Sequence, residues 1–344
     1  MNRRILASSL IVLIFIVGAT STRAQSTEPS RRPPVLRSAG AEGPSQSSAP
    51  RQASQGALIT VPAIVMDRDG RYIGNLSKED FQIYEDGVEQ SLAYFAPVEK
   101  PFTVALMLDV SGSTKYQLDQ IRAAANTFVS RLRYNDRLMA ITFDGQINLL
   151  TDVAEVRTIR QTKLHIPAIT DGTVLYDAVD FTLKRMAQIP GRKAIVLMTD
   201  GVDQSSAATF QSTIAEIAEQ DVLIYTVRYN TLPQFSQRLS LIKSDKARRK
   251  VEQRLLKGYA VSEPYLRTLA EKTGGRFYKS DDLRDVGPAF AAITAELGVQ
   301  YSLGYYAKEG SANGERAIKV RVRYPNLVVR TRDSYATAPA IARQ

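Results

Sequence analysis

Oxygen-bearing side chains follow the end of an apolar run in the first half of the chain. The run, residues 102–108, stops at Asp109, and Ser111 and Ser113 follow on either side of Gly112. An Asp-x-Ser-x-Ser pattern places one carboxylate and two hydroxyls on a single tight loop. These are hard oxygen donors, which suit Mg²⁺ or Mn²⁺ and bind Zn²⁺ poorly. The pattern therefore predicts chemistry at a divalent cation.

Two later segments offer further oxygen donors. Thr173 lies on a glycine-containing turn before an expected helix, and Asp200 follows a second apolar run, residues 193–199. If both runs are strands of one parallel sheet, their carboxyl ends meet at the edge where open α/β sheets bind ligands. We therefore take five residues as candidate metal ligands and none as catalytic: Asp109, Ser111, Ser113, Thr173 and Asp200.

The elements around these residues indicate the fold class. Continuous apolar runs bounded by turn residues are typical of strands buried on both faces of a sheet, and amphipathic segments separate them. This alternation predicts an α/β fold, a doubly wound and mostly parallel sheet of Rossmann-like type. An antiparallel edge strand is expected around residues 146–150. The expected strands are 102–109, 137–143, 193–199 and 222–228, and the expected helices are 115–133, 174–189, 207–220 and 285–298.

The five candidate ligands resemble the metal-ion-dependent adhesion site (MIDAS) of von Willebrand factor type A (VWFA) domains, with every position filled. The resemblance implies that Ser111 and Ser113 bind the metal directly, and that the remaining three bind it directly or through water. It also implies that an acidic residue of a protein partner completes the octahedron. Charge supports the same mechanism, because two acids and otherwise neutral hydroxyls neutralise Mg²⁺ only weakly and leave coordination positions open.

Enzymatic alternatives find little support in the sequence. A Ser-His-Asp hydrolase needs an imidazole base, but the only histidine, His165, falls in a polar loop segment without a Gly-x-Ser-x-Gly elbow. Neither the Walker A motif nor Gly-x-Gly-x-x-Gly, the glycine-rich motifs that bind phosphate groups, occurs in the sequence. Asp177 and Asp203 lie close to the candidate ligands in sequence, yet nothing else marks them as ligands, and Asp177 is expected to be a solvated or capping acid. We expect no enzymatic activity.

The first residues predict export. Two arginines precede an apolar stretch, and Ala24 follows as a small residue at the expected cleavage position, so residues 1–24 are interpreted as a signal peptide. An uncleaved N-terminal anchor is the alternative. Cysteine is absent, which excludes disulfides, cysteine-ligated zinc and thiol catalysis. We expect a protein of the periplasm, the cell envelope or the extracellular space.

The charge balance constrains the partners. The formal net charge is +10, and loss of Arg3, Arg4 and Arg23 with the signal peptide leaves +7. This charge allows loose association with an anionic envelope surface. The basic residues are spread out and no aromatic-basic groove motif occurs, so we do not expect nucleic-acid binding.

The chain divides into five expected segments. Residues 25–56 are rich in Ser, Pro and Gly and predict a disordered linker. Strand-like segments before and after the type A domain are expected to meet in one small β-sandwich-like module. The combination resembles the VWFA-related family of acidobacterial-type secreted proteins. The segments are the signal peptide 1–24, the linker 25–56, the β module 57–99 and 300–338, and the VWFA domain 100–299 with a basic helical insertion at 231–260.

Two features have alternative interpretations. Asp67, Asp69, Glu85 and Asp86 could form a calcium loop, although Asp-Gly turns of hairpins explain them better. The insertion 231–260 could be a solvated helical segment or a partner-binding arm. The sequence thus favours a non-enzymatic, metal-dependent adhesion module that captures a partner's carboxylate. The alternative is a structural envelope component that binds through its β module or its basic insertion.

Overall fold

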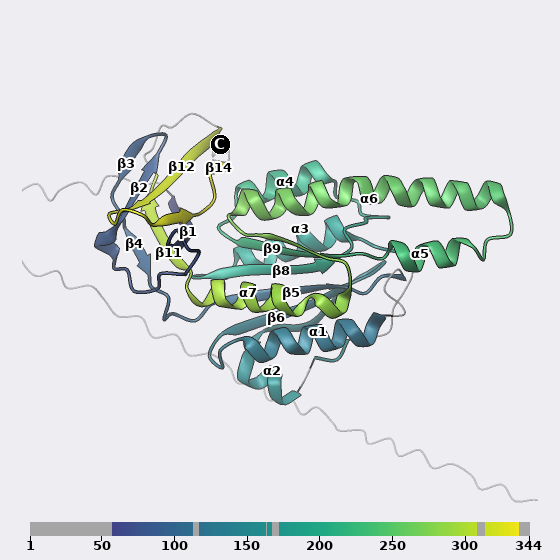
Figure 1. Cartoon of the computed structure of the whole chain (residues 1–344). Coiled ribbons are helices and arrows are strands. Elements are labelled where there is room, and N and C mark those ends of the chain that lie inside the picture. Colours follow the sequence, from purple (N-terminus) through teal and green to yellow (C-terminus); the bar gives the residue numbers. More distant parts are fainter. Residues whose placement is uncertain (1–56, 113–116, 163, 167–171, 308–313, 337–344) are drawn as a thin grey trace, which may run out of the picture. The chain divides into compact units, whose positions relative to one another are not determined.

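The computed structural model describes residues 57–112, 117–162, 164–166, 172–307 and 314–336 (Figure 1). The expected signal peptide 1–24 and linker 25–56 lie outside the described residues, and so does the candidate ligand Ser113.

A six-stranded sheet forms the centre of the α/β domain, in the order β10-β9-β8-β5-β6-β7. β5 is central and pairs in parallel with β6 and β8, while β7 pairs antiparallel with β6 at one edge. Every residue of β5, β8 and β9 is buried, as their continuous apolar runs predicted. The strands are β5 Thr103–Asp109, β6 Arg137–Phe143, β7 Ile147–Glu155, β8 Lys193–Thr199, β9 Leu223–Tyr229 and β10 Phe277–Ser280.

Helices cover both faces of this sheet, which confirms the doubly wound arrangement (Figure 1). On one face Leu106 belongs to a core that includes Phe128 of α1 and Phe290 of α7, whose ring centroids are 5.1 Å apart. On the other face Met107 belongs to a core with Leu183 and Leu269. The helices are α1 Leu118–Arg131, α2 Val156–Thr162 and α7 Gly287–Gly298 on the first face, and α3 Leu175–Ala187, α4 Phe210–Ala218 and α6 Asp245–Thr273 on the second.

The two flanks of the domain meet in a β module, as predicted. β1 of the first flank lies between β11 and β13 of the second, and β2 pairs with β12. Two four-stranded sheets, β13-β1-β11-β4 and β14-β12-β2-β3, share one apolar core. The strands are β1 Leu58–Met66, β2 Phe81–Glu85, β3 Val88–Gln90, β4 Tyr94–Ala96, β11 Tyr301–Tyr306, β12 Glu315–Val322, β13 Val328–Arg330 and β14 Ser334–Ala336.

Asp67, Asp69 and Asp86 lie in or beside turns of the first flank, whereas Glu85 is buried in β2 and accepts the hydroxyls of Tyr305 and Tyr335. Asp86 and Gly87, both with positive φ, form the two-residue loop between β2 and β3. The Asp67 carboxylate accepts main-chain N–H bonds from Asp69 and Arg71. Across the described residues, no group of three or more His, Cys, Asp or Glu side chains is arranged to hold a metal ion. Turn formation therefore accounts for Asp67 and Asp86.

The later part of the basic insertion, residues 245–260, and the residues that follow it, 261–273, form one continuous helix. α5 spans Leu232–Leu239, and α6 then runs for 29 residues through Pro264 to the left-handed Gly274. Sequence alone separates the two parts, because proline usually ends a helix. None of the helices in the described ranges combines the length and apolar character needed to cross a membrane.

Candidate metal site

Asp109 and Asp200 lie at the same edge of the central sheet. Asp109 is the last residue of β5, and Asp200 directly follows β8, the parallel neighbour of β5. The main-chain carbonyl of Thr173 accepts N–H bonds from Gln204 and Ser205, which attaches the turn before α3 to the segment after Asp200. Four candidate ligands, Asp109, Ser111, Thr173 and Asp200, therefore come from segments that meet at this edge, and all four are buried.

The Asp109 carboxylate is held in place but is electrostatically unfavourable. Oδ1 accepts the Ser111 N–H at 3.0 Å, and Oδ2 accepts the Thr199 hydroxyl at 2.6 Å. Burial, followed by the negative charge of Asp200, raises the pKa of Asp109 to about 7 despite these hydrogen bonds. A cation between the two acids would offset both the burial and the repulsion.

Asp200 is oriented by residues that sequence reasoning missed. Its Oδ1 accepts the Val202 N–H at 3.0 Å, and its Oδ2 accepts the Thr231 hydroxyl at 2.7 Å. Thr231 is also bound to Tyr259, whose hydroxyl oxygen contacts Thr231 Oγ1 and accepts the Thr231 N–H at 3.1 Å. The position of Thr231 in the sequence is a signal that could have identified it. Thr231 lies just after the end of β9, and β9 is the parallel neighbour of β8.

The donor set fits a hard divalent cation. Carboxylate and hydroxyl oxygens from Asp109, Ser111, Thr173 and Asp200 are the ligand types that Mg²⁺ and Mn²⁺ take in proteins, and neither histidine nor cysteine is involved. The paired burial of two acids is the feature that a cation would compensate. The residues present therefore suit Mg²⁺ or Mn²⁺ better than Zn²⁺.

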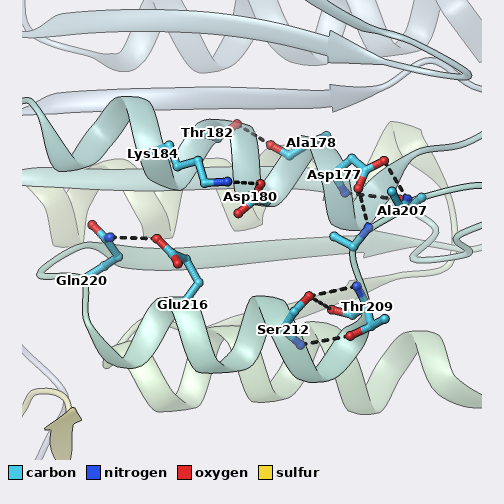
Figure 2. A network of polar contacts seen from close by, with 12 residues as sticks. Asp177, Ala178, Asp180, Thr182, Lys184, Ala207, Thr209, Ser212, Glu216 and Gln220 are labelled. Atoms are coloured by element: carbon cyan, nitrogen blue, oxygen red, sulfur yellow. Dashed lines mark hydrogen bonds and ion pairs between the residues drawn. The ribbon is translucent and has the colours of Figure 1, made fainter. Parts of the chain in front are cut away.

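The remaining polar residues near this edge have structural roles. Figure 2 shows Asp177, on α3, beside Ala207. The Asp177 carboxylate accepts the main-chain N–H groups of Ala207 and Ala208 at 2.9 and 2.7 Å. This agrees with a capping acid, since the bonds hold the segment that leads into α4. Asp203 accepts the Ser206 hydroxyl at 2.5 Å and the Ser206 N–H at 3.3 Å. His165 is an exposed loop residue.

Comparisons with solved structures find similar folds at low sequence identity. Solved structures with similar folds include an aerotolerance-related membrane protein from Bacteroides fragilis, with 16% identity over 57% of this chain and 98% of that one, at a TM-score of 0.40. A von Willebrand factor type A protein from Catenulispora acidiphila shows 9% identity over 81% and 72%, at 0.43. The manganese-loaded TRAP protein from Plasmodium vivax shows 14% identity over 75% and 100%, at 0.36.

No curated protein matches the chain. Residues 104–202, which contain Asp109, Ser111, Thr173 and Asp200, match the family model described as von Willebrand factor type A domain. The chain is therefore a protein that carries a von Willebrand factor type A domain.

Proposed function

We propose that this chain is an exported, metal-dependent protein-binding module. In this proposal Mg²⁺ or Mn²⁺ is held by five residues and captures a carboxylate of a protein partner. Ser111 and Ser113 bind the metal directly, and the other three bind it directly or through water. The five residues are Asp109, Ser111, Ser113, Thr173 and Asp200.

One observation carries the proposal, namely the burial of Asp109 next to the charge of Asp200 at the carboxyl edge of the sheet. Two carboxylates formally balance the charge of a divalent cation. The other ligands in this proposal are neutral hydroxyls and water, which add no negative charge. Mg²⁺ also keeps several waters until a stronger ligand displaces them. An anionic oxygen from outside is thus the favoured additional ligand.

The same features support binding over catalysis. A hydrolytic triad would require an imidazole beside Ser111, and the only histidine of the chain is the exposed loop residue His165. The site is built from main-chain N–H groups and hydroxyls that orient carboxylates. We therefore propose a site that recognises a carboxylate without converting it.

The proposal includes the arrangement of the whole chain. Residues 1–24 direct export to the periplasm or beyond, residues 25–56 are a linker, and residues 100–299 are the binding domain. The segments 57–99 and 300–338 form the β module that supports the domain. This division follows the composition of the sequence and the pairing of β1 with β11.

Calorimetric titration of the purified chain with Mg²⁺ tests the proposal, with and without a carboxylate-bearing peptide. We expect weak binding of Mg²⁺ alone and tighter binding in the presence of the peptide. Asp109→Ala should abolish both signals, while the exposed Asp119→Ala on α1 serves as a control. Equal Mg²⁺ affinity in Asp109→Ala and the parent would contradict the site.

Native envelope extracts distinguish this function from the structural alternative. A partner captured in Mg²⁺ and released by EDTA supports the metal-dependent module. A partner retained equally in both conditions would instead support binding through the β module or through the basic insertion.

A further inference from the structure

The first half of α6 and the residues just before it form a basic surface, here called the basic arm, residues 243–257. It carries seven basic residues against two acids, Asp245 and Glu252. Within the described residues Arg248 pairs with Asp245, and the other basic side chains of the arm form no ion pair. The basic residues are Lys243, Lys246, Arg248, Arg249, Lys250, Arg254 and Lys257.

Four of the seven positive charges lie on one face of the helix. Lys246, Lys250, Arg254 and Lys257 are spaced by four, four and three residues, which places them on one side of an α-helix. Leu255 and Tyr259 lie on the opposite side, and they are the buried residues of this part of α6. The basic stripe thus faces away from the domain, and its side chains are exposed.

The arm is fixed to the segment that follows Asp200. Val202 forms a small apolar cluster with Leu255 and Tyr259, and Leu232 and Phe235 of α5 pack against it. Gly258 permits close contact at this point, because a Cβ there would lie only 2.7 Å from Val202 Cγ1. The base of the arm therefore has a defined position beside the candidate metal site.

The arm extends past the end of the sheet that carries the site. Thr273, at the end of α6, binds the N–H of Ile224 near the start of β9, whereas Tyr259 binds Thr231 just after the end of β9. The residues from Tyr259 back to Asp245 therefore project beyond the carboxyl ends of the strands, as Figure 1 shows. At 1.5 Å per residue this projection is about 20 Å long.

We propose that the basic arm binds an acidic segment of the same protein partner whose carboxylate the metal captures. The inference rests on the proposed function and adds a second contact to it. Charge complementarity selects an acidic polypeptide, because one partner then satisfies both cationic features at this end of the domain.

The geometry favours a polypeptide over a membrane surface. A helix that binds in the membrane interface buries a continuous apolar face opposite or beside its basic face. In α6 the side opposite the stripe is already packed on Val202 through Leu255 and Tyr259. Val251 and Leu256 are exposed apolar residues of the arm, but five residues at 3.6 per turn set them about 140° apart around the helix, with Glu252 between them. The arm therefore lacks the continuous apolar face that would enter the lipid.

Fluorescence anisotropy with a labelled Asp- and Glu-rich peptide tests this inference on the full-length protein at physiological ionic strength. The arm variant carries Lys246→Glu, Lys250→Glu and Arg254→Glu, which preserve helix propensity. The control variant carries the same charge change on the β module, at three exposed residues without a described ion pair. Those substitutions are Arg68→Glu, Lys78→Glu and Lys319→Glu.

We expect the arm variant to bind the peptide about tenfold more weakly than the parent, since three exposed attractions become repulsions. The control variant should remain within about twofold, since its changes lie far from the arm. Circular dichroism and melting should show that both variants fold like the parent. Parent-like affinity in a folded arm variant overturns the inference.

The two proposals fail in different ways. Peptide binding that depends on the stripe but ignores EDTA supports the arm and contradicts the metal-dependent function. Binding that depends on Mg²⁺ and Asp109 but not on the basic stripe supports the metal-dependent function. It contradicts the proposal that the basic arm binds an acidic segment. Binding of phosphatidylglycerol vesicles or of a DNA duplex is measured in the same variants. If that binding depends on the stripe while peptide binding does not, the proposal for the basic arm is also contradicted.

Discussion

The hydroxyl of Thr231 donates a hydrogen bond to the carboxylate of Asp200, with 2.7 Å between Thr231 Oγ1 and Asp200 Oδ2. This bond joins the segment after β9 to the end of β8, and Tyr259 of α6 binds the same threonine. The carboxylate of Asp200 is thereby oriented from the side of the basic arm. Mutation of residues that orient metal ligands typically lowers metal affinity by about 10- to 100-fold.

Thr231→Val should weaken Mg²⁺ binding by about tenfold, because valine keeps the shape of threonine but cannot hold the Asp200 carboxylate. Calorimetric titration gives the dissociation constants. Thr213→Val is a matched control, since Thr213 is also buried but its hydroxyl binds carbonyl groups near the start of α4. Unchanged Mg²⁺ affinity in Thr231→Val would show that the hydrogen bond does not orient a ligand.

The metal-free protein should lose stability as pH rises from about 4 to about 7. Burial, and then the charge of Asp200, raise the pKa of Asp109 from 3.8 to about 7. In this interval the folded protein holds a proton that the unfolded chain has released, so the free energy of unfolding falls with rising pH. Melting temperatures in EDTA across this range measure the effect.

Asp200→Asn provides the control for this pH dependence. It removes the second cause of the shift and leaves the burial, so the fall in stability should end at a lower pH. Asp109→Asn should remove the contribution of Asp109 and leave a smaller dependence, because burial also raises the pKa values of Asp136 and Glu296. Metal binding should show the opposite trend in the parent, with affinity rising up to about pH 7, because Mg²⁺ competes with the proton. A metal-free melting temperature that is independent of pH would contradict the raised pKa.

The central strands could be predicted from the sequence because burial on both faces leaves a continuous apolar run. The predicted ranges 137–143 and 193–199 coincide with β6 and β8. Asp109 and Asp200 could then be placed at one edge, since the carboxyl ends of neighbouring parallel strands meet. Local sequence was sufficient because Asp109 is the last residue of its strand and Asp200 directly follows its own.

The residues that orient these acids could not be predicted in the same way. Thr231 reaches Asp200 only because β9 pairs with β8, and Tyr259 reaches Thr231 only because α6 continues through Pro264. Strand order and the path of a long helix depend on packing between distant segments. A proline in the sequence instead favours a break, so the connection between the basic arm and Asp200 was not apparent.

Thr173 lies on a turn, yet only 1% of its surface is exposed. An alanine there would leave a cavity, so its effects on stability and on binding would be mixed. Thr173→Val removes the hydroxyl at nearly constant volume and should lower Mg²⁺ affinity by about tenfold, the size of effect seen when a polar group around a metal is lost. Thr173→Ser keeps the hydroxyl and should retain the affinity. Equal losses in the two variants would assign Thr173 a packing role only.

Glu296 links the β module to the α/β domain through a buried carboxylate. It lies on α7, is fully buried, and accepts a bond from the Tyr72 hydroxyl at 2.8 Å. Arg276 pairs with it at 2.8 Å, and Arg330 of β13 forms a second ion pair. Tyr72 and Arg330 belong to the β module, so one carboxylate holds both parts together.

Glu296→Ala should destabilise the protein by about 3 kcal/mol, because removing one partner of a buried ion pair leaves the other charges unpaired. Urea unfolding followed by circular dichroism measures the change. Glu271→Ala is the control, since Glu271 is exposed and lies 3.8 Å from Arg267, and such surface pairs contribute less than about 1 kcal/mol. The β module should also become easier to release by protease in the Glu296 variant. Equal unfolding free energies for the two variants would mean that the contact is not what holds the β module in place.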